Sequence, residues 1–272
     1  MLPETVASYE HLCKSSAMNI SLLTNRDLVS HIVLSRLIGL LSGHRLSIFI
    51  SEKVGRDQSL PQPLMALAEF EKQLIAASPH SFDSLARQAG CRLQGFADID
   101  NRVNGTQGIE RIKASEPDVI LSIRFGLIIR EPIIAIPKYG VINLHSGLLP
   151  DYRGVMASFR AMVNGDAEIG STLHYIPDGG VDTGDILSIA RAPLNPEQSY
   201  LLNVLSLYTA GCRQMAFAVQ QLDSDISLRA QPQQGQANYY SFPTDLELEE
   251  FFALGYQLFN PAEIEQIRAL QA

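Results

Sequence analysis

Residues 18 to 23 read Met-Asn-Ile-Ser-Leu-Leu, a short apolar run that opens the part of the sequence deciding the fold. A second apolar run covers residues 45 to 50. Between them, apolar side chains recur at helical spacing, at Val29, Ile32, Val33, Leu37 and Leu40. A strand, a helix and a strand in this order predict a β-α-β unit, whose helix carries the chain between two parallel strands.

The same alternation continues through the first half of the chain. Further helices are predicted at roughly 63 to 78 and 106 to 115, and further buried strands at 118 to 123 (DVILSI) and 140 to 144 (GVINL). Strands that alternate with helices favour a parallel sheet with helices on both faces. We therefore expect an α/β fold with a doubly wound, mostly parallel sheet of the Rossmann-like kind.

The pattern changes after residue 170. The strand-like runs STLHYI and ILSIA flank a segment rich in glycine and aspartate, residues 177 to 184, which predicts a hairpin with a long loop. A helix over about 198 to 222, a polar linker over 231 to 238 and a packed tail follow. We expect an N-terminal extension (1–17), a main domain (18–222) and a short α/β C-terminal extension packed on the core (223–272).

The composition favours a soluble, cytoplasmic globular protein. Hydrophobic residues make up 46% and charged residues 18%, and the net charge is -8 without a basic run, which argues against nucleic acid as a partner. We expect no membrane segment, because no stretch approaches 18 uncharged apolar residues and the N-terminus lacks a signal-peptide core. The three distant cysteines, Cys13, Cys91 and Cys212, indicate reduced thiols and no zinc site.

The segment from Asn143 to Gly154, NLHSGLLPDYRG, carries the chemistry. Residues i and i+2 of a strand face the same side, so Asn143 and His145 should point together into the ligand-binding edge of the sheet. An amide donor beside an imidazole suits acyl transfer, in which an oxyanion is stabilised and a proton moves. A carboxylate is the expected third member, and spacing leaves three candidates open: Asp178, Asp182 and Asp185. The histidines show no metal-ligand spacing.

These motifs resemble those of the folate-dependent formyltransferase family. The string NLHSGLLP, the later GSTLH and the Asp-rich loop follow the family's order, and the likeness reaches back to Pro117–Ile129. The resemblance implies an N-formyltransferase that passes a formyl group directly from 10-formyltetrahydrofolate to an amine. It places the catalytic triad on Asn143, His145 and Asp182, so that residues 18–222 would be the catalytic domain, without a metal.

The resemblance also implies where the folate binds. Two segments of the family line the pterin pocket, and here they correspond to Phe125, Gly126, Leu127, Ile128, Ile129, Pro177, Asp178 and Gly179. Plain core packing is an equal alternative for the apolar members. His174 matches a family histidine, but a single histidine in a strand is also a common structural residue.

Departures from the family pattern bear on the acceptor. The loop Thr24-Asn-Arg-Asp27 is not the Gly-Ser-rich phosphate cradle of a purine-pathway enzyme. About fifty residues follow the last helix of the main domain, where tRNA-acting relatives carry a barrel domain. Ser146-Gly147 replaces the usual family residues, and the added glycine would loosen the turn. We therefore expect a small acceptor, first of all a nucleotide-linked amino sugar, and compatibility with a homodimer, since sugar-acting relatives often pair.

Four other functions remain as alternatives at this point. An amino acid such as hydroxyornithine is the next acceptor, and a formyltetrahydrofolate hydrolase would use a similar triad. A folate-binding module without activity would keep the fold alone. A nicotinamide-dependent oxidoreductase has the least support, because no GxGxxG follows the first strand.

Overall fold

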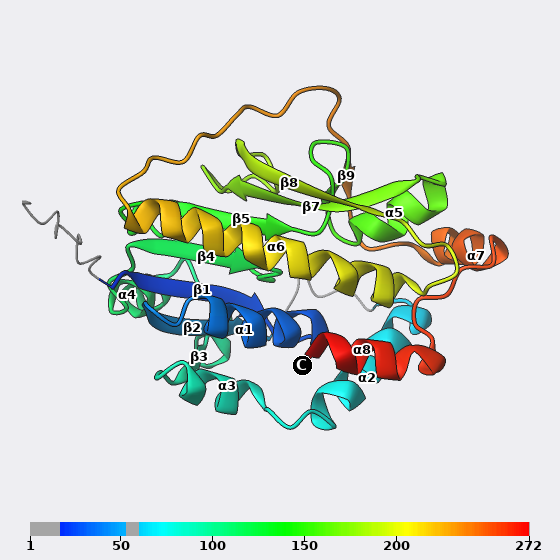
Figure 1. Cartoon of the computed structure of the whole chain (residues 1–272), viewed down its shortest axis with the longest axis horizontal. Helices are drawn as coiled ribbons and strands as arrows, with labels where there is room; N and C mark the ends of the chain where they lie inside the picture. The colour runs from blue at the N-terminus through cyan, green and yellow to red at the C-terminus, as the bar shows by residue number, and fades with distance from the viewer. Residues whose placement is uncertain (1–16, 53–59, 272) are drawn as a thin grey trace, which may run out of the picture.

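A computed structural model describes residues 17–52 and 60–271. The N-terminal extension expected over 1–17 lies outside these ranges except for its last residue. In the described part, a mixed seven-stranded sheet forms the centre of the molecule, with helices on both faces (Figure 1). The predicted α/β class with a mostly parallel sheet is confirmed.

The sheet has the strand order β3-β2-β1-β4-β5-β7-β8. Its first five strands are parallel, and β7 is antiparallel to both of its neighbours. The predicted hairpin at the end of the domain is therefore confirmed. The bounds are β1 Asn19–Asn25, β2 Arg45–Ser51, β3 Leu93–Gly95, β4 Val119–Ile123, β5 Val141–His145, β7 Glu168–Tyr175 and β8 Ile186–Pro193. A separate pair joins β6, Arg153–Gly154, to β9, Tyr239–Tyr240.

Eight α-helices are described: α1 Leu28–Leu40, α2 Gln62–Ala76, α3 Phe82–Gln88, α4 Thr106–Lys113, α5 Ala157–Asn164, α6 Tyr200–Asp223, α7 Asp245–Ala253 and α8 Ile264–Gln271. The four predicted in the main domain, at α1, α2, α4 and α6, are confirmed within a few residues. The sequence patterns missed α3 and α5, because seven or eight residues hold only two helical turns of apolar repeat. No helix in the described ranges is long and apolar enough to cross a membrane.

Each face of the parallel strands is buried against its own hydrophobic cluster, because a parallel sheet is covered on both sides. On one face, Leu22, Leu121 and Leu144 pack beneath α1 and α6. On the other, Leu23, Ile120 and Val141 pack with Phe96, Val103 and Ile112, which lie between β3 and the end of α4. This double burial explains why the strands read as mostly apolar runs.

The C-terminal residues belong to the larger of these two clusters. Leu248, Phe251, Leu258 and Ile267 are all buried in it. The start of α6 is held to the tail by backbone bonds from Tyr200 N to the Gln257 carbonyl oxygen, 2.8 Å, and from Leu201 N to the Leu258 carbonyl oxygen, 3.0 Å. A capping box between Thr244 and Glu247 begins α7. The tail thus completes the core.

Candidate active site

Asn143 and His145 are the third and last residues of β5, at the carboxyl end of the parallel strands. Antiparallel pairing sets Asn143 opposite His174 and His145 opposite Thr172 in β7. The alternation of the strand sends both side chains to the same side, as the sequence predicted. His145 is buried and Asn143 half-buried, so the protein itself fixes their orientation.

Asp182 joins them from the loop between β7 and β8. Its backbone has a left-handed φ of 52°, an uncommon state for a residue other than glycine. One carboxylate oxygen, Oδ2, accepts from Gly154 N at 2.8 Å and lies 3.4 Å from His145 Nδ1. The other, Oδ1, lies 3.4 Å from both His174 Nε2 and Asn143 Nδ2. The side chains of Asn143 and His145 thus meet at the carboxylate of Asp182, as predicted from the family resemblance.

The two other candidate aspartates do not enter this cluster. Asp178 turns its side chain back into its own loop, where Oδ1 accepts from Gly180 N at 2.7 Å. Asp185 is exposed, and its carbonyl oxygen accepts a hydrogen bond from Tyr175 N at 3.0 Å. Of the three carboxylates that spacing left open, the fold brings only Asp182 to Asn143 and His145.

The electrostatics of the cluster favour an ionised Asp182. Burial alone would raise the pKa of its carboxyl, because a charge is poorly solvated in the interior. The charge of His145, the contact with His174 and the Gly154 amide together outweigh that effect and lower the pKa of Asp182 to about 2. The site therefore holds a fixed negative charge at neutral pH, only 10% exposed.

Both ring nitrogens of His145 face acceptor oxygens. Nε2 lies 2.6 Å from the Tyr152 carbonyl oxygen, and Nδ1 faces Asp182. A neutral imidazole donates only one hydrogen, so only the doubly protonated ring satisfies both contacts. When both ring nitrogens carry hydrogens, His145 places a positive charge next to Asp182 and can stabilise negative charge on a substrate without moving.

His174 belongs to the same network, a role that the sequence left undecided. Its Nδ1 lies 2.8 Å from the Tyr175 carbonyl oxygen, and its Nε2 lies 3.0 Å from Asn143 Nδ2 and 3.4 Å from Asp182 Oδ1. Asn143 thus directs its amide hydrogens at His174 and Asp182. To donate to an oxyanion, the amide must exchange one of these internal partners for the substrate. The available signal for His174 was its place in the Gly-Ser-Thr-Leu-His string.

Gly147 is closely packed beside the triad, a feature that the sequence did not predict. A Cβ at this position would lie 2.5 Å from His145 Nε2 and 2.6 Å from the Ala157 Cβ. Real Cβ contacts are longer than this, so either the imidazole or α5 would have to shift. Gly147 therefore helps to set where the His145 ring lies.

The segment expected to line the folate pocket has a mixed character. Phe125 and Leu127 are half-buried, and Gly126 N donates to Ser51 Oγ at 2.9 Å. Ile128 is 48% exposed, whereas Ile129 is 4% exposed and packs in the core. The matching loop, Pro177–Gly179, is exposed except for half-buried Gly179, which lies beside Arg130.

Two acidic side chains, Asp27 and Glu71, bind backbone amides at the start of α1, next to the end of β1. Asp27 caps α1 by accepting from Ser30 N at 2.8 Å, and it receives Arg124 Nε at 2.8 Å. Glu71 of α2 accepts from Leu28 N, and burial, followed by the negative charge of Asp27, raises the pKa of Glu71 to about 8. These side chains occupy the helix amides that would otherwise attract a phosphate.

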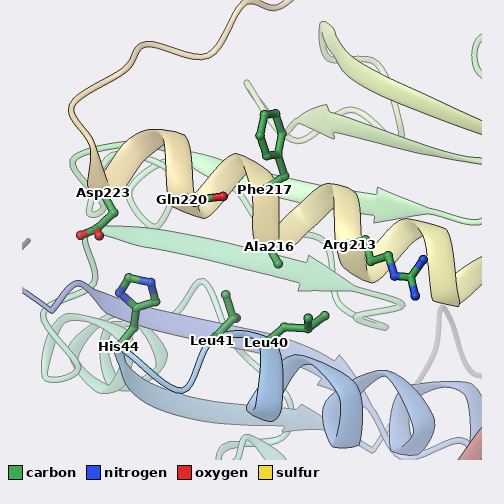
Figure 2. A pocket seen from close by; sticks show the side chains of 8 residues that line it. All are labelled: Leu40, Leu41, His44, Arg213, Ala216, Phe217, Gln220 and Asp223. Atoms are coloured by element: carbon green, nitrogen blue, oxygen red, sulfur yellow. The ribbon is translucent and has the colours of Figure 1, made fainter.

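A pocket of about 430 Å³ lies between the end of α1 and α6, lined by Leu40, Leu41, His44, Arg213, Ala216, Phe217, Gln220 and Asp223 (Figure 2). Met18 N donates to His44 Nδ1 at 3.3 Å, so this pocket lies at the amino ends of the strands, at the opposite edge from the triad. In the described ranges, no three histidine, cysteine or acidic side chains are grouped to hold a metal.

Comparison with known proteins finds a similarity to formyltransferases. Residues 81–201 match the formyl transferase family, and this segment contains Asn143, His145, His174 and Asp182. The methionyl-tRNA formyltransferase of Chlamydia caviae is 35% identical over 153 residues, which cover 56% of this chain and 46% of the relative. That of Ralstonia pickettii is 34% identical over 135 residues, 50% and 41% of the two chains. The chain is therefore similar to formyltransferases over this segment, and it spans about half the length of these relatives.

Solved structures share the fold. Glycinamide ribonucleotide transformylase 1 of Symbiobacterium toebii superposes with a TM-score of 0.58 and 17% identity, covering 79% of this chain and 94% of its own. WlaRD, a sugar 3N-formyl transferase solved in the presence of dTDP and 5-N-formyl-THF, gives a TM-score of 0.57 with 16% identity over 88% and 79%. At such identities the likeness establishes the architecture.

Proposed function

We propose that this protein transfers a formyl group from 10-formyltetrahydrofolate to the amine of a small acceptor, with a nucleotide-linked amino sugar as the leading acceptor. The observation that carries the proposal is the meeting of Asn143, His145 and Asp182 at the carboxyl ends of the strands, inside the segment that matches the formyl transferase family. Open α/β sheets bind their ligands at this edge.

The reaction follows from the charges and donors of the site. The amine nitrogen attacks the formyl carbon, and the carbonyl oxygen becomes an oxyanion. Asn143 Nδ2 and the His145 imidazolium stabilise that oxyanion. The bond from the formyl carbon to folate N10 then breaks, N10 takes a proton, and the amine loses one. No formyl-enzyme is formed.

The low pKa of Asp182 defines its part in this sequence. A carboxylate with a pKa of about 2 is a weak base on its own. Asp182 therefore keeps His145 charged and oriented, and it passes the amine's proton onward towards N10. The folate would lie along Phe125–Ile128, the Ile129 backbone and the Pro177–Gly179 loop, and no step requires a metal.

Two features support a small acceptor. An N-formyltransferase of Helicobacter canadensis, solved with folinic acid and dTDP-3-aminofucose, aligns over 88% of this chain and 80% of its own, with a TM-score of 0.56 and 17% identity. In addition, the carboxyl groups of Asp27 and Glu71 occupy the α1 amides, which disfavours an acceptor whose phosphate must bind there. The similarity to methionyl-tRNA formyltransferases supports tRNA as a second acceptor, although the net charge of -8 disfavours the binding of a polyanion.

The test is the release of tetrahydrofolate from 10-formyltetrahydrofolate by the purified protein. It is run without acceptor and then with dTDP- and GDP-linked amino sugars, hydroxyornithine, and methionyl-tRNA. Faster release with an amino sugar supports the proposal, and release driven by another amine replaces the acceptor. Equal release with and without acceptor indicates a hydrolase. Folate binding without release in any arm contradicts an enzymatic function.

A further inference from the structure

The polar segment after α6 crosses the active site, although its sequence suggested only a linker. From the end of α6 the chain runs back along the outer edge of the sheet and reaches β9 (Figure 1). Gln231 exchanges two backbone bonds with Ile186 at the start of β8, 2.8 and 2.9 Å. Further on, the Asn238 carbonyl oxygen receives Arg153 N at 3.0 Å. The segment is thus anchored on both sides of the triad.

Gln233 lies between these anchors and joins the loop that contains Asp182 to the segment that contains Arg153. Its Nε2 donates to the carbonyl oxygens of Asp182 and Gly184, both at 2.8 Å. Its Oε1 accepts from Arg153 Nε at 3.1 Å and from a terminal Arg153 nitrogen at 2.7 Å. All the hydrogen-bonding atoms of this amide are therefore used, which is uncommon for a half-buried side chain in a linker.

The contact falls on the backbone position that most needs support. Asp182 has a φ of 52°, and non-glycine residues in the left-handed region cost on the order of 1 kcal/mol or more unless their surroundings hold them. The loop around it is rich in glycine, which gives it little stiffness of its own. Beside Arg153, Gly154 N donates to the Asp182 carboxylate, so Gln233 fixes both sides of that hydrogen bond.

We propose that Gln233 is a positioning residue, which holds the backbone of Asp182 so that its carboxylate faces His145. The inference rests on the proposed formyl transfer and adds a residue from the C-terminal extension to the site. Gln233 acts through Asp182 and does not touch the reacting atoms. A displacement of about 1 Å at such a carboxylate lowers turnover by up to about a hundredfold.

Three variants separate this role from a general effect on the fold. Gln233→Ala removes the whole contact. Gln233→Glu keeps oxygens for Arg153 but has no N–H for the two carbonyl oxygens. Gln234→Ala is the matched control, because Gln234 is the exposed neighbour on the same segment. With 10-formyltetrahydrofolate and the fastest acceptor of the panel, we expect kcat to fall about ten- to a hundredfold in both Gln233 variants, with the folate KM and the Tm nearly unchanged.

A spectroscopic measurement needs no substrate. The amide proton of Gly154 donates to the Asp182 carboxylate, so its NMR shift reports where that carboxylate lies. We expect this resonance to move upfield in Gln233→Ala and Gln233→Glu and to stay in place in Gln234→Ala. An unmoved resonance, or wild-type kcat in Gln233→Glu, would overturn the proposal. Wild-type protein that releases no tetrahydrofolate with any acceptor refutes the formyl transfer, while the Gly154 shift still tests the positioning.

Discussion

Replacing Asp182 by asparagine tests the electrostatics of the site in activity and in stability at once. The variant keeps the size of the side chain and an oxygen for Gly154 N but removes the charge that faces His145. The pKa of Asp182 falls from 3.8 to about 2 in the folded protein. At about 1.4 kcal/mol for each tenfold change in proton affinity, this corresponds to about 2 kcal/mol of stability at neutral pH.

The sign follows from the direction of the change. A lowered pKa means that the folded state binds the proton less tightly than the unfolded state. The contribution is therefore complete above pH 3.8 and is lost as the pH falls through about 2. Urea unfolding should show Asp182→Asn to be less stable by about 2 kcal/mol at pH 7, with a gap that narrows below pH 3.8.

Turnover should fall by at least about a hundredfold in the same variant, because the imidazolium loses the group that orients it. Asp185→Asn is the control, since this exposed carboxylate in the same loop lies outside the cluster. It should leave both quantities near the wild-type values. If Asp182→Asn matches this control in turnover and in unfolding free energy at pH 7, the assigned charge pair is wrong.

Two further variants test neighbouring features. Gly147→Ala places a Cβ 2.5 Å from His145 Nε2, so turnover should drop at least about tenfold and the free energy of unfolding by about 1–3 kcal/mol. The control is Gly43→Ala, which should change neither quantity because its added Cβ meets nothing within 4 Å. Normal turnover in Gly147→Ala would refute the packing argument. Glu71→Gln removes a carboxyl group whose pKa is raised to about 8. Its contribution to the stability of the folded protein is complete below pH 4.5 and is lost as the pH rises through about 8. The Tm of Glu71→Gln relative to wild type should therefore rise between pH 5 and pH 9. Glu69→Gln, at an exposed position on the same helix, should show no such trend. The same Tm difference between Glu71→Gln and wild type at both pH values would contradict the raised pKa of Glu71.

The parallel part of the fold was readable because both faces of its strands are buried. The runs at β1, β2, β4 and β5 are mostly apolar, and α1 repeats its apolar residues with helical period. The missed strand β3 has three residues, and β6 and β9 have two each. Elements of that length are created by their partners, as when Gly154 pairs with Tyr240, and local sequence holds no record of such a partner.

The site was readable only where periodicity or a family motif reached it. Strand alternation alone brings Asn143 and His145 together. The choice of Asp182 over Asp178 and Asp185 needed the family resemblance, because a left-handed backbone decides which carboxylate turns inward.

Gln233 was missed for a different reason. A polar residue in a polar segment is typical of an exposed linker, and nothing in that segment marks the carbonyl oxygens that the glutamine binds. These oxygens belong to Asp182 and Gly184, about fifty residues earlier in the chain. Contacts between segments this far apart become visible only in the folded structure.

The most direct test of the account is tetrahydrofolate release from 10-formyltetrahydrofolate with a panel of nucleotide-linked amino sugars, measured for the wild-type protein and for His145→Ala. The account predicts release that depends on an amine acceptor in the wild type and falls by at least about a hundredfold in the variant. Acceptor-dependent release that survives unchanged in His145→Ala would contradict the central claim that this cluster performs the transfer.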